Sequence, residues 1–129
     1  MKNILFTILL VCLTITINAK SLIVKTKYLW EVNVNTKIST PIVERITYFE
    51  FDPEDTKTII VNENGNESTF KVLKFKMNNN GDIVQIDFNC QNKLSIIYTW
   101  DPKQDSKIIT FYFENDTNYR NYSNVKFQE

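Results

Sequence analysis

Histidine is absent from the 129-residue sequence, and glycine and proline are scarce, with two and three residues respectively. Histidine is the usual general base and the commonest zinc ligand, so its absence excludes Ser-His-Asp and Cys-His catalysis. Two glycines cannot form a glycine-rich phosphate-binding loop. The 15 basic and 15 acidic residues balance, whereas a nucleic-acid-binding protein needs a basic surplus. We therefore expect no catalytic residues, no metal site, no cofactor and no nucleic-acid partner.

Charge is also absent from a long apolar run near the start of the chain. Lys2 is followed by a run over residues 4–17 that only threonines and one cysteine interrupt, and then by the small residue Ala19. This pattern is typical of a secretory signal peptide over residues 1–19. We expect cleavage after Ala19 and a mature protein that is secreted or periplasmic.

A lipoprotein signal is the alternative, in which Cys12 becomes the acylated first residue. The residue before such a cysteine is normally small, whereas Val11 is not. The apolar run is also shorter than the roughly 20 residues that a helix needs to cross a bilayer, and later segments are interrupted by charge. We therefore expect a soluble mature protein without a transmembrane span.

Removing 19 of the 129 residues leaves 110, over residues 20–129, with 14 basic and 15 acidic groups and a formal charge of −1. That length suits a single domain with a hydrophobic core. Cys90 is the one cysteine left, so no intramolecular disulfide can stabilise the mature chain. Because Cys90 is in phase with the apolar positions Ile86 and Phe88, we expect a buried structural thiol.

Apolar residues recur with period two between clusters of Asn, Asp, Gly and Pro, which is the signature of half-buried antiparallel strands. No segment of the mature chain has a convincing helical period. The predicted strands cover residues 28–35, 42–51, 57–62, 68–77, 82–90, 94–100, 107–113 and 122–127.

Turn residues and the phase of the apolar positions predict how these strands pair. Asn80-Gly81 favours a two-residue type I′ turn, which pairs Met77 with Val84. A three-residue loop over 91–93 suits the next connection, because it keeps the apolar positions of both strands on one face. These registers predict one buried face made of Leu73, Phe75, Met77, Val84, Ile86, Phe88, Leu94, Ile96, Tyr98 and Trp100.

Asn64-Gly65 predicts another two-residue turn, but the strand that follows it changes phase. Phe70 and Val72 are out of phase with Leu73 and the apolar positions after it. Either both faces of that strand end are covered, or a β-bulge near Val72 and Leu73 switches the phase. We favour the bulge, because it would bend the sheet so that it can close.

Eight short strands joined by short loops form either an up-and-down barrel or a two-sheet sandwich. Sequential hairpins and the bulge favour the barrel. We therefore predict an all-β fold, an antiparallel meander of about eight short strands that closes as an up-and-down barrel over residues 20–129.

A chain with this fold and these absences is best interpreted as an exported, non-catalytic binding module for a small apolar ligand or another exported protein. Tyr98 and Trp100 are the candidate ligand-binding residues, with Trp30 and Tyr48 as further contributors. Tyrosine and tryptophan combine a large apolar area with one polar group, so they can line a cavity and still orient a ligand.

Two alternative functions remain open. A pair of carboxylates can cleave glycosides without histidine, and acidic residues gather in the segments 52–55 and 101–105. Asp-Pro sequences after aromatic strand ends are also good turn formers. The alternatives are a small hydrolase or isomerase that uses carboxylates, and a structural or assembly protein.

Overall fold

The computed structural model describes residues 22–51 and 57–128. They form nine strands in one antiparallel sheet, with a single turn of 3-10 helix, η1, between β5 and β6. The elements are β1 (Leu22–Asn33), β2 (Val43–Phe51), β3 (Thr58–Glu63), β4 (Asn66–Asn79), β5 (Val84–Cys90), η1 (Gln91–Lys93), β6 (Leu94–Asp101), β7 (Ser106–Phe113), β8 (Asn118–Ser123) and β9 (Lys126–Gln128). No helix in these residues is long and apolar enough to cross a membrane.

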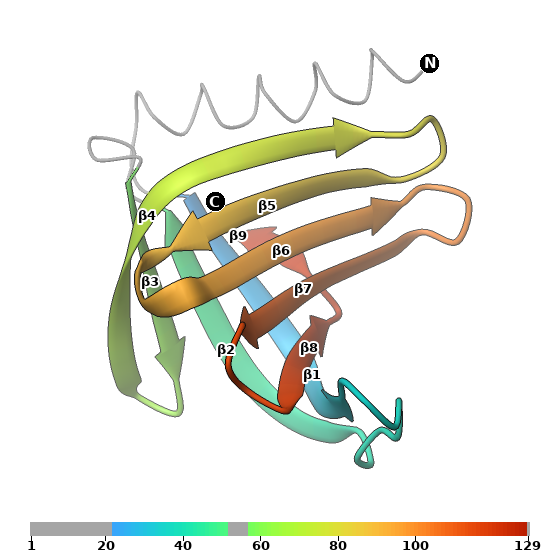
Figure 1. Ribbon diagram of the computed structural model, residues 1–129, viewed down its shortest axis with the longest axis horizontal. Helices are drawn as coiled ribbons and strands as arrows, with labels where there is room; N and C mark the ends of the chain where they lie inside the picture. Colours follow the sequence, from blue (N-terminus) through green and yellow to red (C-terminus); the bar gives the residue numbers. More distant parts are fainter. Residues whose placement is uncertain (1–21, 52–56, 129) are drawn as a thin grey trace.

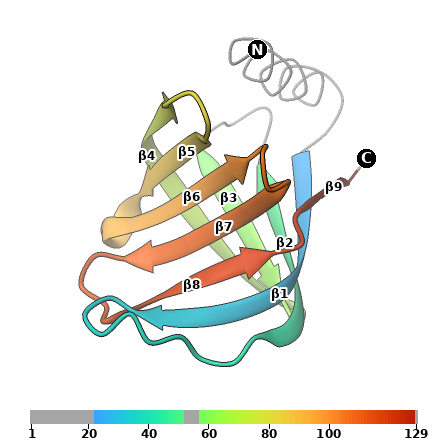
Figure 2. The same cartoon turned by 90° about the vertical axis from the view of Figure 1, so that its right-hand side faces the viewer.

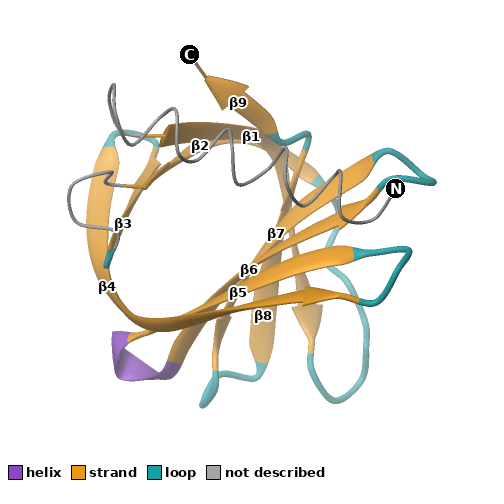
Figure 3. Ribbon diagram, turned by 90° about the horizontal axis from the view of Figure 1, so that it is seen from above, coloured by secondary structure: helices purple, strands orange, loops and turns teal. Residues whose placement is uncertain are grey.

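The sheet closes on itself, because β1 pairs with β2 on one edge and with β8 on the other. Each strand from β1 to β8 pairs with the next one along the chain, so the barrel is an up-and-down meander (Figures 1 and 2). Seen from above, the strands enclose a ring (Figure 3). The all-β fold and the preference for a barrel over a sandwich are confirmed, whereas the expected signal peptide lies outside the described residues.

Two of the predicted turns are confirmed. Asn64 and Gly65 have φ angles of 53° and 79°, and they join β3 to β4 as a two-residue turn. In η1, Asn92 has φ 61° and ψ 29°, the predicted left-handed conformation, and Cys90 pairs with Leu94. Turn chemistry and apolar phase agree at both positions, which is why the sequence predicted them correctly.

The predicted two-residue turn at Asn80-Gly81 is wrong. The Asn80 Oδ1 atom accepts hydrogen bonds from the backbone N–H groups of Asp82 and Ile83, at 3.3 and 3.1 Å, and this side-chain turn widens the loop to residues 80–83. The pairing therefore shifts by two residues, and Met77 lies opposite Ile86. Because side chains alternate with period two, a register shift of two residues leaves each side chain on its original face of the sheet.

The β-bulge in β4 is confirmed, since the register with β5 shifts between Val72 and Lys74. Val72 is buried in the core, whereas Leu73 at the bulge is 64% exposed. The prediction that Leu73 belongs to the buried face is therefore wrong. Phe75 is also 59% exposed, although its ring lies 6.2 Å from that of Phe88, so it too is not buried as predicted.

Two strands begin well before their predicted boundaries. β1 begins at Leu22, six residues earlier than expected, and its start pairs with β9 as well as β2. β8 begins at Asn118, four residues before the predicted last strand. Its sequence lacks an apolar alternation because Arg120, two residues before the buried Tyr122, points into the barrel.

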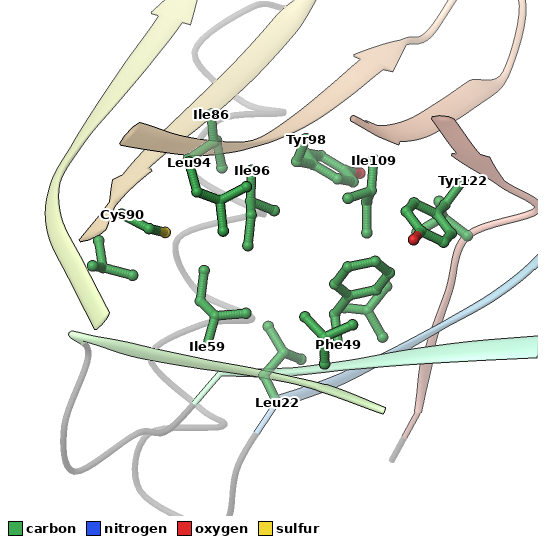
Figure 4. Close-up of a cluster of buried hydrophobic side chains, with 14 of the residues drawn as sticks. Leu22, Phe49, Ile59, Ile86, Cys90, Leu94, Ile96, Tyr98, Ile109 and Tyr122 are labelled. Atoms are coloured by element: carbon green, nitrogen blue, oxygen red, sulfur yellow. The ribbon is translucent and has the colours of Figure 1, made fainter. Parts of the chain in front are cut away.

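The core lies inside the barrel, where side chains from β5 to β8 face those from β1 to β3 (Figure 4). Phe49 is fully buried, and its ring meets that of Tyr122 edge to face, with centroids 5.1 Å apart. Cys90 is buried as predicted, and burial, with a smaller contribution from Asp87, raises the pKa of its thiol to about 11. Full burial of one such aromatic side chain stabilises a fold by about 1.5–3 kcal/mol.

Candidate ligand-binding site

Tyr98 and Trp100 lie together at the end of the barrel that carries the β4–β5 and β6–β7 turns. Tyr98 lines an apolar cavity of about 40 Å³ that is partly open to solvent and that Phe88 and Phe127 also line. The cavity is far smaller than the roughly 300–1,000 Å³ of typical ligand pockets. Burial raises the pKa of the Tyr98 hydroxyl to about 12. This part of the interior is therefore mostly filled by side chains.

Trp100 packs against the core from the same strand as Tyr98. Its indole Nε1 is buried without a hydrogen-bond partner among the described residues. The Lys107 ammonium lies 6.0 Å from the centre of its ring. Trp100 therefore contributes a cation–π contact and an unsatisfied donor at the edge of the core.

Trp30 and Tyr48 lie on the outer face of the barrel. Each is flanked by a residue that is buried in the interior, Leu29 beside Trp30 and Phe49 beside Tyr48, so their own side chains point outward. Tyr48 lines an open depression of about 330 Å³ on the outer surface with residues of β3 and β4. The structure thus brings two of the four candidate residues together and leaves the other two on a different surface.

The opposite end of the barrel interior is polar. We define the arginine mouth as the inward-facing side chains of Glu31, Arg45, Glu63, Arg120 and Tyr122. Each charged member follows or precedes a buried residue of its strand by two positions, which places it on the inner face. The mouth lies where the β3–β4 and β7–β8 turns meet the connection after β1, at the lower end of the molecule in Figure 1.

The charged groups of the arginine mouth form a continuous network. Arg45 Nη1 donates to Glu63 Oε1 at 2.9 Å, and the Tyr122 hydroxyl donates to Glu63 Oε2 at 3.3 Å. Arg120 Nη1 lies 3.9 Å from Glu63 Oε2, and its Nε donates to Glu31 Oε1 at 3.2 Å. The two glutamates and two arginines therefore alternate in charge across the inner wall.

Burial and neighbouring charge both act on the protonation states in this network. Burial alone would lower the pKa of Arg120, but Tyr122, Glu63 and Glu31 outweigh it and raise that pKa above its ordinary value. Burial also raises the pKa of Tyr122, against the opposing effect of Arg120. At neutral pH the guanidinium is therefore charged, and the Tyr122 hydroxyl keeps its proton and remains a donor.

Two adjoining cavities open at the arginine mouth, and they share Phe70, Phe111 and Arg120. We call the first the acidic lobe; its volume is about 270 Å³, and Glu31, Phe113, Asp116 and Asn118 complete its lining. The second, the arginine lobe, has a volume of about 330 Å³ and is completed by Arg45, Val61, Glu63, Asn64, Asn66, Ser68 and Tyr122. Both volumes approach or reach the size of pockets that hold small ligands.

Three phenylalanines form the apolar wall of these lobes. The rings of Phe70 and Phe111 lie edge to face with centroids 5.4 Å apart, and Phe111 and Phe113 repeat that arrangement at the same distance. Aromatic walls with a few charged groups are the usual composition of a small-molecule site. Chemically, the arrangement can bind and orient a ligand with an apolar body and a polar head.

Sequence reasoning did not find the arginine mouth, because it searched for tyrosine and tryptophan on the apolar face. The signal that could have found it is the phase of the charged residues. Arg45 is in phase with Phe49, and Arg120 is in phase with Tyr122, so both occupy positions at which a barrel strand points inward.

The expected acidic turns lie elsewhere. Residues 52–55 fall outside the described residues, and Asp101 accepts a hydrogen bond from the Lys103 backbone N–H at 3.1 Å, as a turn former does. Within residues 22–51 and 57–128, no three histidine, cysteine, aspartate or glutamate side chains gather so that they could hold a metal ion. Comparison with known protein families, curated proteins and solved structures finds no match to this chain.

Proposed function

We propose that this protein is a non-catalytic binding module that holds a small molecule in the arginine mouth. The carrying observation is the pair of adjoining cavities walled by phenylalanines and bordered by an ordered network of charged groups. These charged side chains line a partly solvated opening, with Glu63 19% and Arg120 45% exposed, whereas a purely structural interior would be filled with apolar residues. A ligand site explains why this end of the interior is polar and open.

The ligand is expected to be small and amphipathic. Its apolar part would contact Phe70, Phe111 and Phe113, and its polar part would meet the charged rim near Arg120. The opposite end of the interior does not compete for it, since the cavity beside Tyr98 has a volume of about 40 Å³.

Nuclear magnetic resonance of the full mature protein tests this proposal directly. Small aromatic amines, aromatic carboxylates and neutral aromatic alcohols would be titrated, and the shifted backbone amides mapped on the barrel. We expect shifts around Arg45, Glu63 and Arg120 for at least one class. Shifts confined to the outer surface or to the neighbourhood of Tyr98, or the absence of shifts with all three classes, would contradict the proposal.

A matched pair of variants then tests the location. Arg120→Gln removes a charge from the arginine mouth, whereas Lys103→Gln removes one from an exposed ion pair with Asp82, 3.3 Å long, at the other end of the barrel. Binding should be weakened by Arg120→Gln and unchanged in Lys103→Gln. Equal affinities in the two variants would place the ligand elsewhere.

A second candidate function, binding of another exported protein, is favoured by an apolar surface patch. Ile38 and Ile42 in the connection after β1 are 70% and 65% exposed, and Ile46 and Tyr48 on the outer face of β2 are also exposed. A second copy of the chain is the partner that can be tested first. Sedimentation should show association that Ile42→Asn with Ile46→Asn abolishes, and a wild-type protein that is monomeric at every concentration would contradict it.

We also propose export, with the mature chain beginning at Lys20. The support is the apolar run over residues 4–17 and the small residue Ala19. The intact mass of the secreted protein measures this. A mass that retains residues 1–19, or that matches an acylated Cys12, would contradict the proposed cleavage.

A further inference from the structure

We propose that the ligand of the arginine mouth is a small organic cation, a compact aromatic ammonium compound whose charged nitrogen sits in the acidic lobe. This inference rests on the proposed function and names the chemical class of its ligand. It follows from the charge balance of the lining, from the aromatic wall, and from the size of the lobe.

The charge balance favours a cation. The two lobes are lined by three carboxylates, those of Glu31, Glu63 and Asp116, and by the two guanidinium groups of Arg45 and Arg120. Both arginines already face glutamates, at 2.9 Å for Arg45 and Glu63 and at 3.2 Å for Arg120 and Glu31. One negative charge is therefore left over in the lining.

Asp116 carries that surplus charge. Its Oδ1 atom accepts hydrogen bonds from the backbone N–H groups of Thr117 and Asn118, at 2.8 and 3.5 Å, which fix the carboxylate in the β7–β8 turn. Among the described residues, no lysine or arginine forms an ion pair with it. Asp116 is exposed, so water solvates its carboxylate in the free protein, and an ammonium group in the acidic lobe would give it a partner of opposite charge.

The arginine lobe is correspondingly poor at attracting an anion. Glu63 receives hydrogen bonds from both Arg45 and Tyr122 and lies 3.9 Å from Arg120. Its side chain is 19% exposed, so these interactions are partly shielded from water. An anion bound by either arginine would share that guanidinium with a glutamate, so it would lie close to a carboxylate that repels it.

The phenylalanines add a second attraction for a cation. Phe70 and Phe111 line both lobes and Phe113 lines the acidic lobe, and edge-to-face packing turns these rings in different directions. Ring faces carry negative potential and attract ammonium groups within about 6 Å, which is how aromatic cages recognise quaternary ammonium ligands. A volume of about 270 Å³ limits the ligand to a small molecule.

Isothermal titration calorimetry of the mature protein with four probes of similar skeleton tests the class. The probes are phenethylamine, phenethyltrimethylammonium, 3-phenylpropionate and 2-phenylethanol. We expect the two cations to bind more tightly than the alcohol, and the carboxylate to bind most weakly. Tighter binding of the carboxylate or the alcohol than of both cations would overturn the inference and leave the proposed function standing.

Asp116→Asn tests the location, with Asp82→Asn at the other end of the barrel as the matched control. Asparagine keeps the acceptor atom of the turn and removes the charge. Because Asp116 is exposed, water screens its attraction for an ammonium group, so Asp116→Asn should weaken phenethylamine binding by about two- to fivefold, and the control should not. Equal affinities in the two variants would overturn the assigned site.

Phe111→Leu tests whether the aromatic ring itself attracts the cation. Leucine keeps the cavity apolar but removes the aromatic face. This variant should weaken the binding of phenethyltrimethylammonium more than the binding of 2-phenylethanol. Equal losses for both would contradict recognition of the cation by the ring. If none of the four probes binds, and the resonance titrations also show no ligand, the proposed function itself fails.

Discussion

The two ends of the barrel interior are built from the same strands but differ in what fills them. Around Tyr98 and Phe88 the side chains are apolar and leave a cavity of about 40 Å³. Around Arg120 they are charged, and they leave two adjoining cavities of about 270 and 330 Å³. The first end stabilises the fold by excluding water, and the second, which we propose as the ligand site, is partly solvated and lined by paired charges.

The difference also shows in two buried tyrosines. Burial acts alone on Tyr98, and it raises the pKa of that residue to about 12. Burial raises the pKa of Tyr122 as well, but there the Arg120 guanidinium acts against it. A buried hydroxyl is thus isolated at one end and part of an electrostatic network at the other.

The largest expected effect comes from removing the aromatic side chain between the two ends. Phe49→Ala deletes a fully buried ring that packs edge to face on Tyr122, and it should lower the free energy of unfolding by about 3–5 kcal/mol. Leu73→Ala, at an exposed position, is the control and should change it by less than about 0.5 kcal/mol. Urea denaturation measures both, and equal costs would contradict the assigned core.

A smaller effect is expected from breaking the network of the arginine mouth. Glu63→Gln removes the carboxylate shared by Arg45 and Tyr122, and since the arginine is partly solvated we expect a cost of about 1–2 kcal/mol. Glu44→Gln breaks an exposed ion pair of 3.8 Å with Lys27 and should cost less than about 0.5 kcal/mol. If both variants unfold at the same urea concentration, the network contributes nothing to stability.

The smallest effect is a pH dependence that belongs to the apolar end. Because the pKa of Tyr98 is raised from 10 to about 12 on folding, its contribution to stability is complete below pH 10 and is lost as pH rises towards 12. Between pH 8 and pH 11, the free energy of unfolding should therefore fall by about 1 kcal/mol more in the wild type than in Tyr98→Phe. The measurement is the free energy of unfolding at pH 8, 10 and 11 for both proteins.

Cys90 titrates in the same range and must be separated from Tyr98. Burial and Asp87 raise the pKa of its thiol to about 11. The contribution of Cys90 to the stability of the fold is therefore also lost as pH rises from about 9. Cys90→Ala in both the wild type and Tyr98→Phe isolates the tyrosine. An alkaline slope that Tyr98→Phe leaves unchanged in the Cys90→Ala background would contradict the assignment.

Local patterns in the sequence were sufficient for most of the fold. Apolar alternation and turn residues predicted antiparallel hairpins, the three-residue loop with left-handed Asn92, and the bulge after Val72. The Asn80-Gly81 turn failed because the Asn80 side chain, which dipeptide preferences do not consider, bonds to the backbone of residues further along the loop.

The candidate site could not be predicted to the same degree. Arg45, Glu63 and Arg120 come from three different strands, and the separation between the last two is 57 positions in the chain. In the sequence, each of these three residues looks like an ordinary charged residue on the solvent-exposed face of a strand. Only the pairing of β1 with both β2 and β8 closes the barrel and brings these three side chains to one opening, where they pair with one another.

By itself, the sequence determined strands, most turns and the phase of each strand, because these depend on residues close together in the chain. The tertiary structure alone decided that the space around Tyr98 is filled by core side chains, and that Trp30 and Tyr48 lie outside the barrel. The physical reason is that closure of the barrel is a long-range event. It converts one face of every strand into a shared interior, in which packing and charge pairing are properties of several strands together.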